Sequence, residues 1–169
     1  EEILTGRRDR FSKANLGYIY NEMAKDILEE VKLSCDGASS EQKVLPAMQE
    51  VNDPLEKARR EFDGIMRDFE RRPYEIGIMP FAFSGMALER MIESDLYLWA
   101  GQISDGQATA GLRSTRDYRL LKAFESAVES LDFAVRAMIV NAEIKNEHAI
   151  GIFYEVFGKT LDICQKVAE

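Results

Sequence analysis

The sequence has very few of the residues that carry most metal and catalytic chemistry. It contains one histidine, His148, and two cysteines, Cys35 and Cys164. A structural zinc site needs four Cys or His ligands in closely spaced pairs. A di-iron bundle needs two Glu-x-x-His pairs, but Lys145 stands three residues before the one histidine. These shortages exclude both kinds of metal site, so we expect no metal and no cofactor.

The short motifs of common enzymes are also missing. Neither a G-x-S-x-G nucleophile motif nor a glycine-rich phosphate loop occurs in the chain. Two pairs of carboxylates, Glu89 with Glu93 and Glu147 with Glu155, have the right residue type for a general acid and base. On amphipathic helices such charges ordinarily form the solvated face. We therefore predict no catalytic residues and no enzyme.

Positive charge is scarce relative to negative charge. The chain has 22 Lys and Arg against 30 Asp and Glu, a formal net charge of −8. Nucleic acids and anionic membranes bind clustered positive charge, so neither is an expected partner. No apolar run approaches the roughly 20 residues that span a bilayer. The chain opens with Glu1-Glu2 instead of a signal segment, which suggests an excised domain or a processed product with no membrane contact of its own.

The two cysteines leave the compartment open. Buried, inert thiols are the more common arrangement. A disulfide between Cys35 and Cys164 would instead close a very long loop and stabilise the fold by roughly 5 kcal/mol. A disulfide would indicate an extracytoplasmic location, and free thiols a cytoplasmic one.

The hydrophobic pattern is helical throughout. Only four prolines interrupt the chain, and no segment alternates with a period of two. The sequence predicts an all-α, antiparallel up-and-down bundle of four long helices, possibly five, in a single domain of residues 1–169. The first helix should cover residues 8–34. Its expected core stripe is Leu16, Ile19, Tyr20, Met23, Ile27 and Val31.

Two segments carry strict heptad seams, the pattern of a coiled coil. The first runs from Ser39-Ser40 to Arg72, and we expect a kink or short break at Asp53-Pro54. The second begins at Ser114 or Thr115, as an N-cap, and runs to about Lys145. The first seam is Met48, Val51, Leu55, Ala58, Phe62, Ile65 and Phe69. The second is Leu121, Phe124, Val128, Leu131, Val135, Met138 and Ala142.

The remaining segments are less sharply defined. A helix should open at Pro80, with an apolar face that includes Leu96 and Trp99, and residues 102–116 should be the least structured internal stretch. After Asn146 and Gly151 the apolar pattern resumes. Either the helix that begins near 114 continues to the C-terminus, or a fifth helix turns back. The sequence does not decide between these. The resumed pattern is Ile150, Phe153, Phe157, Leu161, Cys164 and Val167.

Two groups of residues are candidates for binding a small anion. Arginine offers a planar fork of donors that suits carboxylates and phosphates. Arg67 and Arg71 lie four residues apart on one helix face, although we favour the simpler explanation that these arginines pair with neighbouring acids. The other group approaches an expected helix N-terminus, where backbone amides attract anions. It consists of Thr109, Arg113, Ser114, Thr115 and Arg116.

The length, acidic helical composition and heptad seams resemble the extracytoplasmic four-helix input domains of bacterial chemoreceptors and sensor kinases. The resemblance implies a non-catalytic sensory or ligand-binding domain for signal transduction. It also implies that both termini lie at one end of the bundle. Five helices would place the termini at opposite ends, so the number of helices tests whether the chain has the arrangement of these input domains.

Two alternatives stay open. One is a cytosolic scaffold or adaptor that uses an exposed apolar stripe for protein–protein interaction or dimerisation, since heptad seams serve partners as well as intramolecular packing. The other is a histidine phosphotransfer domain. His148-Ala149-Ile150-Gly151 resembles that family's His-x-Leu-Lys-Gly motif, but here the Lys is absent and the Gly comes one position early.

Overall fold

The computed structural model describes residues 2–34, 41–71, 76–103, 110–144 and 147–168. Over these residues it is helical throughout, with five α-helices and no strand, which confirms the predicted all-α up-and-down bundle. The fifth helix settles the alternative that the sequence left open. The elements are α1 (Glu2–Ser34), α2 (Glu41–Arg71), the 3-10 helix η1 (Ile76–Ile78), α3 (Met79–Ile103), α4 (Ala110–Ile144) and α5 (Glu147–Ala168).

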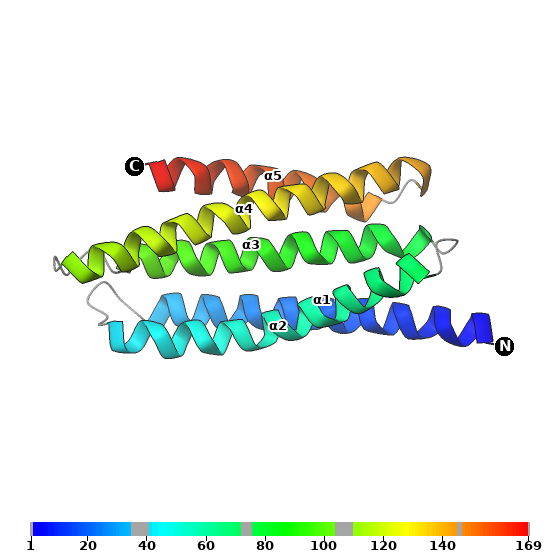
Figure 1. The fold of residues 1–169 in the computed structure, drawn as a ribbon, viewed down its shortest axis with the longest axis horizontal. Helices are drawn as coiled ribbons and strands as arrows, with labels where there is room; N and C mark the ends of the chain where they lie inside the picture. Colours follow the sequence, from blue (N-terminus) through cyan, green and yellow to red (C-terminus); the bar gives the residue numbers. More distant parts are fainter. Residues whose placement is uncertain (1, 35–40, 72–75, 104–109, 145–146, 169) are drawn as a thin grey trace.

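Helix α3 is the centre of the bundle. It packs against α1, α2, α4 and α5, and consecutive helices run antiparallel (Figure 1). With five helices, the first and last described residues lie at opposite ends of the molecule (Figure 1). The arrangement therefore gives no support to the likeness with four-helix input domains. Within the described ranges, none of the helices combines the length and the apolar character that a bilayer span requires.

Two helix starts and one predicted helix break differ from the prediction. Helix α1 begins at Glu2 and α4 at Ala110, both earlier than expected. Helix α2 runs through Asp53-Pro54 without a break. An internal proline removes one backbone hydrogen bond, but Val51 and Leu55 on either side of it are buried in the same core. Packing on both sides of the proline outweighs that loss.

The heptad seam of α2 is confirmed. Its residues from Met48 to Ile65 are buried, and Phe62 is completely enclosed. The Phe62 ring lies against Gly17 of α1 and Gly85 of α3, because a Cβ added to either glycine would collide with it. Tyr18 meets the same ring edge-on, with centroids 5.6 Å apart. One aromatic ring thus joins three helices.

The predicted seam of α4 is wrong. Leu121 is 54% exposed and Val128 47%, whereas a different face of the helix is buried. That face consists of small side chains, which let α4 approach α3 closely. Ser130 Oγ donates to the carbonyl of Ala87 at 2.6 Å, and Ser94 Oγ donates to that of Ala123 at 2.5 Å. The buried α4 residues include Ala123, Ser126, Ala127, Ser130, Ala134 and Ala137.

The predicted stripe of α1 is wrong at three positions for the same reason. Leu16, Ile19 and Met23 are exposed, although Val31 is buried as expected. The buried face again uses small residues where α1 contacts its neighbours. The buried residues of α1 are Arg10, Ala14, Gly17, Asn21, Ala24, Leu28 and Val31. In α5, the buried residues Ile152, Val156 and Ile163 are likewise offset from the predicted Ile150, Phe157 and Leu161, which are exposed.

Candidate functional site

The residues predicted to bind an anion belong to opposite ends of the bundle. Arg67 lies near the end of α2 and Thr115 near the start of α4, and Figure 1 shows these two helix ends far apart. Arg67 is exposed, and its Nε donates to the Asp63 carbonyl at 3.3 Å. The two groups therefore form no common site. Thr109 lies outside the described residues, as do the side chains of Arg71 and Arg113.

Thr115 and Arg116 are not at a helix N-terminus. Because α4 begins at Ala110, both residues lie in its second turn and are half-buried. The expected N-cap at Ser114 or Thr115 is therefore wrong. Backbone amides without a partner inside the helix, which could bind an anion, occur only in the first turn of a helix, and these two residues lie beyond it.

A concave site lies elsewhere, between α1, α3 and α5. Helices α1 and α5 both pack on α3 but hardly touch one another. Between them is a cavity of about 470 Å³, which adjoins a narrower one of about 190 Å³. The two cavities share four lining residues and so form one elongated groove along α3. The shared residues are Lys25, Met91, Ile92 and Lys159.

The floor of this groove is apolar. Leu88, Met91 and Ile92 of α3 supply its centre, and Ile152 of α5 borders it. Leu28 extends the apolar surface along the narrow part. An elongated apolar floor is suited to a hydrocarbon chain rather than to a compact polar solute.

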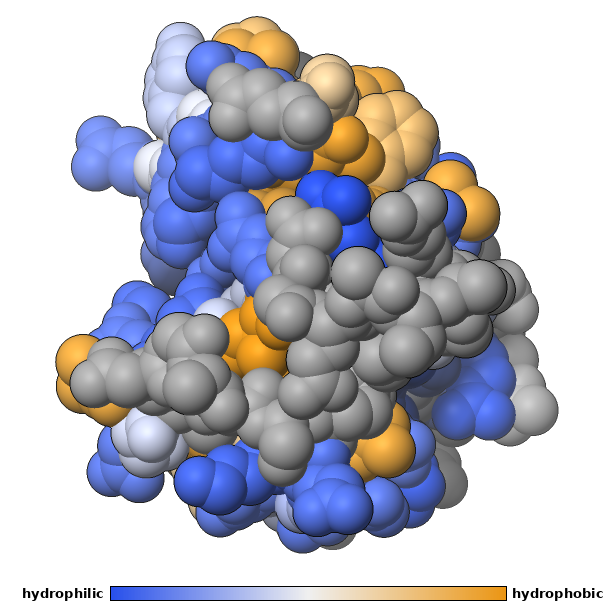
Figure 2. Space-filling view, turned by 90° about the vertical axis from the view of Figure 1, so that its left-hand side faces the viewer, coloured by the Kyte–Doolittle hydropathy of each residue, from blue (hydrophilic) through white to orange (hydrophobic). Residues whose placement is uncertain are grey.

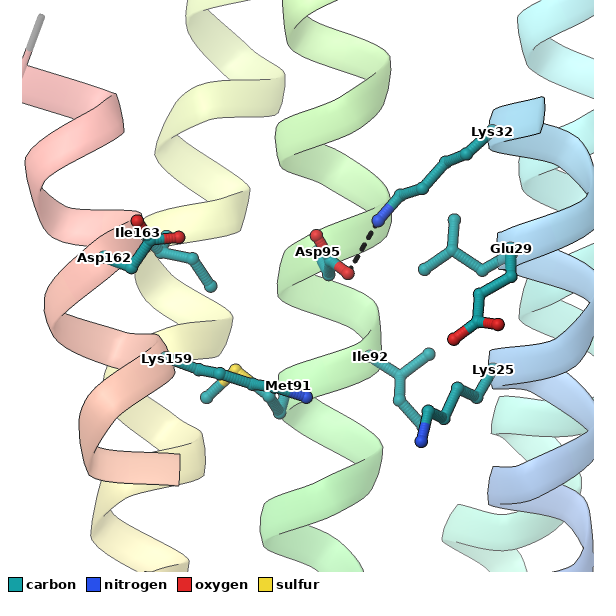
Figure 3. Close-up of a pocket in the computed structure, with 10 residues that line it drawn as sticks. Lys25, Glu29, Lys32, Met91, Ile92, Asp95, Lys159, Asp162 and Ile163 are labelled. Atoms are coloured by element: carbon teal, nitrogen blue, oxygen red, sulfur yellow. Dashed lines mark hydrogen bonds and ion pairs between the residues drawn. The ribbon is translucent and has the colours of Figure 1, made fainter. Parts of the chain in front are cut away.

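The walls of the groove carry charges. Lys25 from α1 and Lys159 from α5 extend toward each other above Met91 and Ile92 (Figure 3). Lys159 pairs with Glu155 at 3.0 Å, whereas Lys25 makes no ion pair within the described part of the chain. Two ammonium groups that approach each other over an apolar floor favour one anionic group between them.

The narrow end of the groove is lined by another ion pair. Lys32 of α1 binds Asp95 of α3 with 2.7 Å between Nζ and Oδ2 (Figure 3). Further acids border the groove on both sides, so a multiply charged anion is disfavoured. They are Glu22, Glu29, Glu155 and Asp162.

The wide end contains a buried acceptor without a donor. Asn21 is 1% exposed, and its Nδ2 donates to the Gly85 carbonyl at 2.9 Å, but its Oδ1 has no hydrogen-bond partner. A buried polar atom left unpaired costs about 1–3 kcal/mol. A ligand that brings an N–H or O–H to this oxygen would recover that free energy.

Aromatic groups complete the wide end. The ring of exposed His148 stacks on Phe81 with centroids 6.0 Å apart, and Tyr18 meets it edge-on at 5.6 Å. Tyr18 donates its hydroxyl proton to the Phe81 carbonyl at 3.0 Å, and burial raises the pKa of this phenol. Tyr18 therefore stays protonated, and its hydroxyl proton is used in the hydrogen bond to Phe81 instead of being available to a ligand.

Charges expected at the solvated surface form a second cluster, inside the bundle. Glu89 of α3 is completely buried, and Arg59 of α2 binds both it and Glu93, the latter at 3.0 Å. Arg90 pairs with Glu93 at 2.7 Å and with Glu129 of α4 at 3.0 Å. The prediction that Glu89 and Glu93 are solvated is therefore wrong, because Arg59 comes from another helix and its approach was not visible in the sequence.

The pKa values of Glu89 and Glu93 are shifted in opposite directions. Burial raises the pKa of Glu89 to about 7, although Arg59 and Arg90 act in the opposite direction. Burial also acts on Glu93, but Arg90 and Arg59 hold its pKa below the usual range. The cluster links α2, α3 and α4 through its ion pairs. Among the described residues, no three His, Cys, Asp or Glu are grouped to hold a metal ion.

Cys164 is a half-buried free thiol, and Cys35 lies outside the described residues. The disulfide considered from the sequence therefore stays a prediction.

No family model, no characterised protein and no solved structure matches the chain. The function proposed below is therefore based on the geometry of the groove. Sequence reasoning missed its residues because Lys25 and Lys159 resemble ordinary solvated lysines on two helices far apart in the chain. The nearest sequence signal was Asn21, an amide within an otherwise small and apolar helix face.

Proposed function

We propose that this chain is a non-catalytic ligand-binding module whose groove between α1, α3 and α5 takes an amphipathic monocarboxylate. The observation that carries the proposal is the approach of Lys25 and Lys159 over the floor formed by Met91 and Ile92. The larger cavity, about 470 Å³, is within the roughly 300–1,000 Å³ of small-molecule sites. The carboxylate would bind between the ammonium groups and the chain along α3.

Asn21 narrows the class of ligand further. It precedes Lys25 by four residues on α1, so the two side chains lie on one side of the helix and reach the same part of a ligand. A ligand with a hydroxyl or amide donor next to its carboxylate would satisfy both Asn21 Oδ1 and Lys25. An N-acylated amino acid has this chemistry.

Calorimetric titration with N-dodecanoylglycine, dodecanoate and dodecylammonium, each below its micelle concentration, tests this proposal. We expect N-dodecanoylglycine to bind more tightly than dodecanoate, which lacks the amide donor, and dodecylammonium to bind most weakly. Lys25→Met should weaken the binding of both carboxylate ligands by about tenfold or more, since a hydrogen bond to a charged group contributes roughly 1.5–3 kcal/mol. Lys43→Met, at an exposed position of α2, is the matched control and should change neither affinity.

Equal binding of dodecanoate and dodecylammonium would contradict the proposal, because it would show that the ammonium groups contribute no selectivity. Undiminished carboxylate binding by the Lys25→Met variant would contradict it as well.

A further inference from the structure

The seam of α4 that the bundle leaves unburied forms part of a larger apolar surface. Helix α5 packs on the side of α4 that carries Ala127 and Ala134, and Thr160 Oγ1 donates to the Ala127 carbonyl at 3.4 Å. Half-buried Leu131 and Met138 continue that side toward the exposed seam. We call the combined surface the α4–α5 face. It consists of Leu121, Phe124, Val128, Val135, Ile139, Ile150, Tyr154, Phe157 and Leu161, all exposed.

The α4–α5 face lies on one side of the molecule. In the end-on view, hydrophobic side chains gather at the upper right, in the part of the bundle that α4 and α5 occupy, and hydrophilic ones lie at the upper left (Figure 2). The spacing of residues along α5 also places the face on one side of that helix. In α5, the exposed apolar residues Tyr154 and Leu161 lie on the other side of the helix from Glu155 and Lys159, which line the groove.

The area of this face exceeds what a monomer usually exposes. From the exposed fractions, its nine side chains present on the order of 800 Å² to solvent. The largest apolar patch of a typical monomer is about 300–600 Å². One partner of a stable interface contributes about 800 Å². The face is therefore large enough for a specific protein interface.

Its charge distribution suits a second copy of the same chain. None of the nine residues is charged, although the chain carries a net charge of −8. Beside the α4 half of the face, Arg136 pairs with Asp132 of the same helix at 2.8 Å. A two-fold contact brings the same surface together twice, so it must be self-complementary. An uncharged apolar face meets this condition without any matching of charges.

The centre of the α5 half is a group of three aromatic rings in contact. Phe153, half-buried against the core, stacks on Phe157 with centroids 6.1 Å apart and meets Tyr154 edge-on at 5.6 Å. Aromatic side chains that are fixed before association are typical centres of binding energy.

We propose that the α4–α5 face is a homodimer interface, in which the α4–α5 hairpins of two copies pack across a two-fold axis as a four-helix layer. The three-and-four spacing of Leu121, Phe124 and Val128 is the spacing that such helix pairing requires. This interface is separate from the groove and does not depend on its ligand.

Light scattering coupled to size exclusion, from low to high micromolar concentration, tests the proposal. We expect a species of twice the mass of the chain. Val128→Glu and Phe157→Glu should each raise the dissociation constant by more than about tenfold, because each buries an unpaired carboxylate in the interface. Circular dichroism should show unchanged helix content, since both positions are exposed in the single chain.

Ile19→Glu is the matched control. Ile19 is 54% exposed on the smaller apolar stripe of α1, and its replacement should leave the dimer intact. A monomer at every concentration would overturn the proposal. A dimer that Ile19→Glu dissociates and Phe157→Glu does not would also overturn it, because the interface would then involve α1.

Discussion

Gly85→Ala is expected to lower the free energy of unfolding by about 3 kcal/mol, at the upper end of the usual cost of overfilling a core. A methyl group at this position collides with the enclosed ring of Phe62. The ring cannot move away, because Gly17 and Tyr18 of α1 confine it from another side. Chemical denaturation followed by circular dichroism measures the change. Gly17→Ala should have an effect of the same kind, since its Cβ would lie 2.5 Å from Phe62 Cζ.

Gly64→Ala is the matched control for this prediction. Gly64 is also inside a helix, but a Cβ there meets nothing within 4 Å. Alanine is favoured over glycine in helix interiors by up to about 1 kcal/mol, so this variant should be as stable as the parent or more so. Phe62→Leu should recover part of the loss in the Gly85→Ala background. If Gly85→Ala destabilised no more than Gly64→Ala, the three-helix contact at Phe62 would be wrong.

Arg59→Met should destabilise the protein by about 3 kcal/mol at pH 8, because removing one partner leaves Glu89 as a buried, poorly compensated charge. Glu93 keeps most of its stabilising contacts in this variant, since Arg90 still binds it at 2.7 Å and Ser126 donates to it at 2.9 Å. The loss should become much smaller at pH 5, where Glu89 is protonated in the folded state. Urea denaturation of parent and variant at the two pH values measures both effects.

The sign of the pH dependence follows from the raised pKa of Glu89. Its pKa is about 7 in the folded protein and about 4.5 when unfolded, so the folded state binds the extra proton between these values. The contribution of Glu89 to stability is therefore greatest below about pH 4.5 and decreases as the pH rises to about 7. Glu93, whose pKa is lowered, contributes in the opposite direction, and its contribution is lost as the pH falls below 4.5.

Glu89→Gln in the Arg59→Met background is the control. Glutamine has nearly the shape of glutamate and never ionises, so the double variant should lose the pH dependence that Arg59→Met adds. An Arg59→Met variant whose destabilisation is equal at pH 5 and pH 8 would show that Glu89 is not the group responsible.

The sequence was sufficient to predict the helical class and the seam of α2. Met48, Val51, Leu55 and Phe62 recur at steps of three and four, and each is buried as that spacing requires. The shortage of histidine and cysteine could also be read directly from the sequence, since it needs only a count of residues. The end of α1 at Ser34 also agrees with the predicted range of residues 8–34.

The faces of α1 and α4 were decided by the tertiary structure. Hydrophobic periodicity selects the bulkiest stripe, such as Leu121 and Phe124, whereas close approach to α3 requires small side chains such as Ala123 and Ser130. A helix that carries both kinds of stripe is ambiguous until its neighbours are placed. The bulky stripe is then left outside, which is why it forms the proposed interface.

The groove and the buried charges depended on the tertiary structure for a related reason. Lys25 and Lys159 are 134 positions apart in the sequence, and Arg59 is 30 from Glu89. A single helix determines which face each side chain lies on, because its period is fixed by the backbone. Which faces meet depends on how five helices pack around α3, and that depends on side-chain shape at every contact at once. The sequence by itself therefore determined the helical class and the buried seam of α2, and the packing determined the buried faces of the other helices and the sites between them.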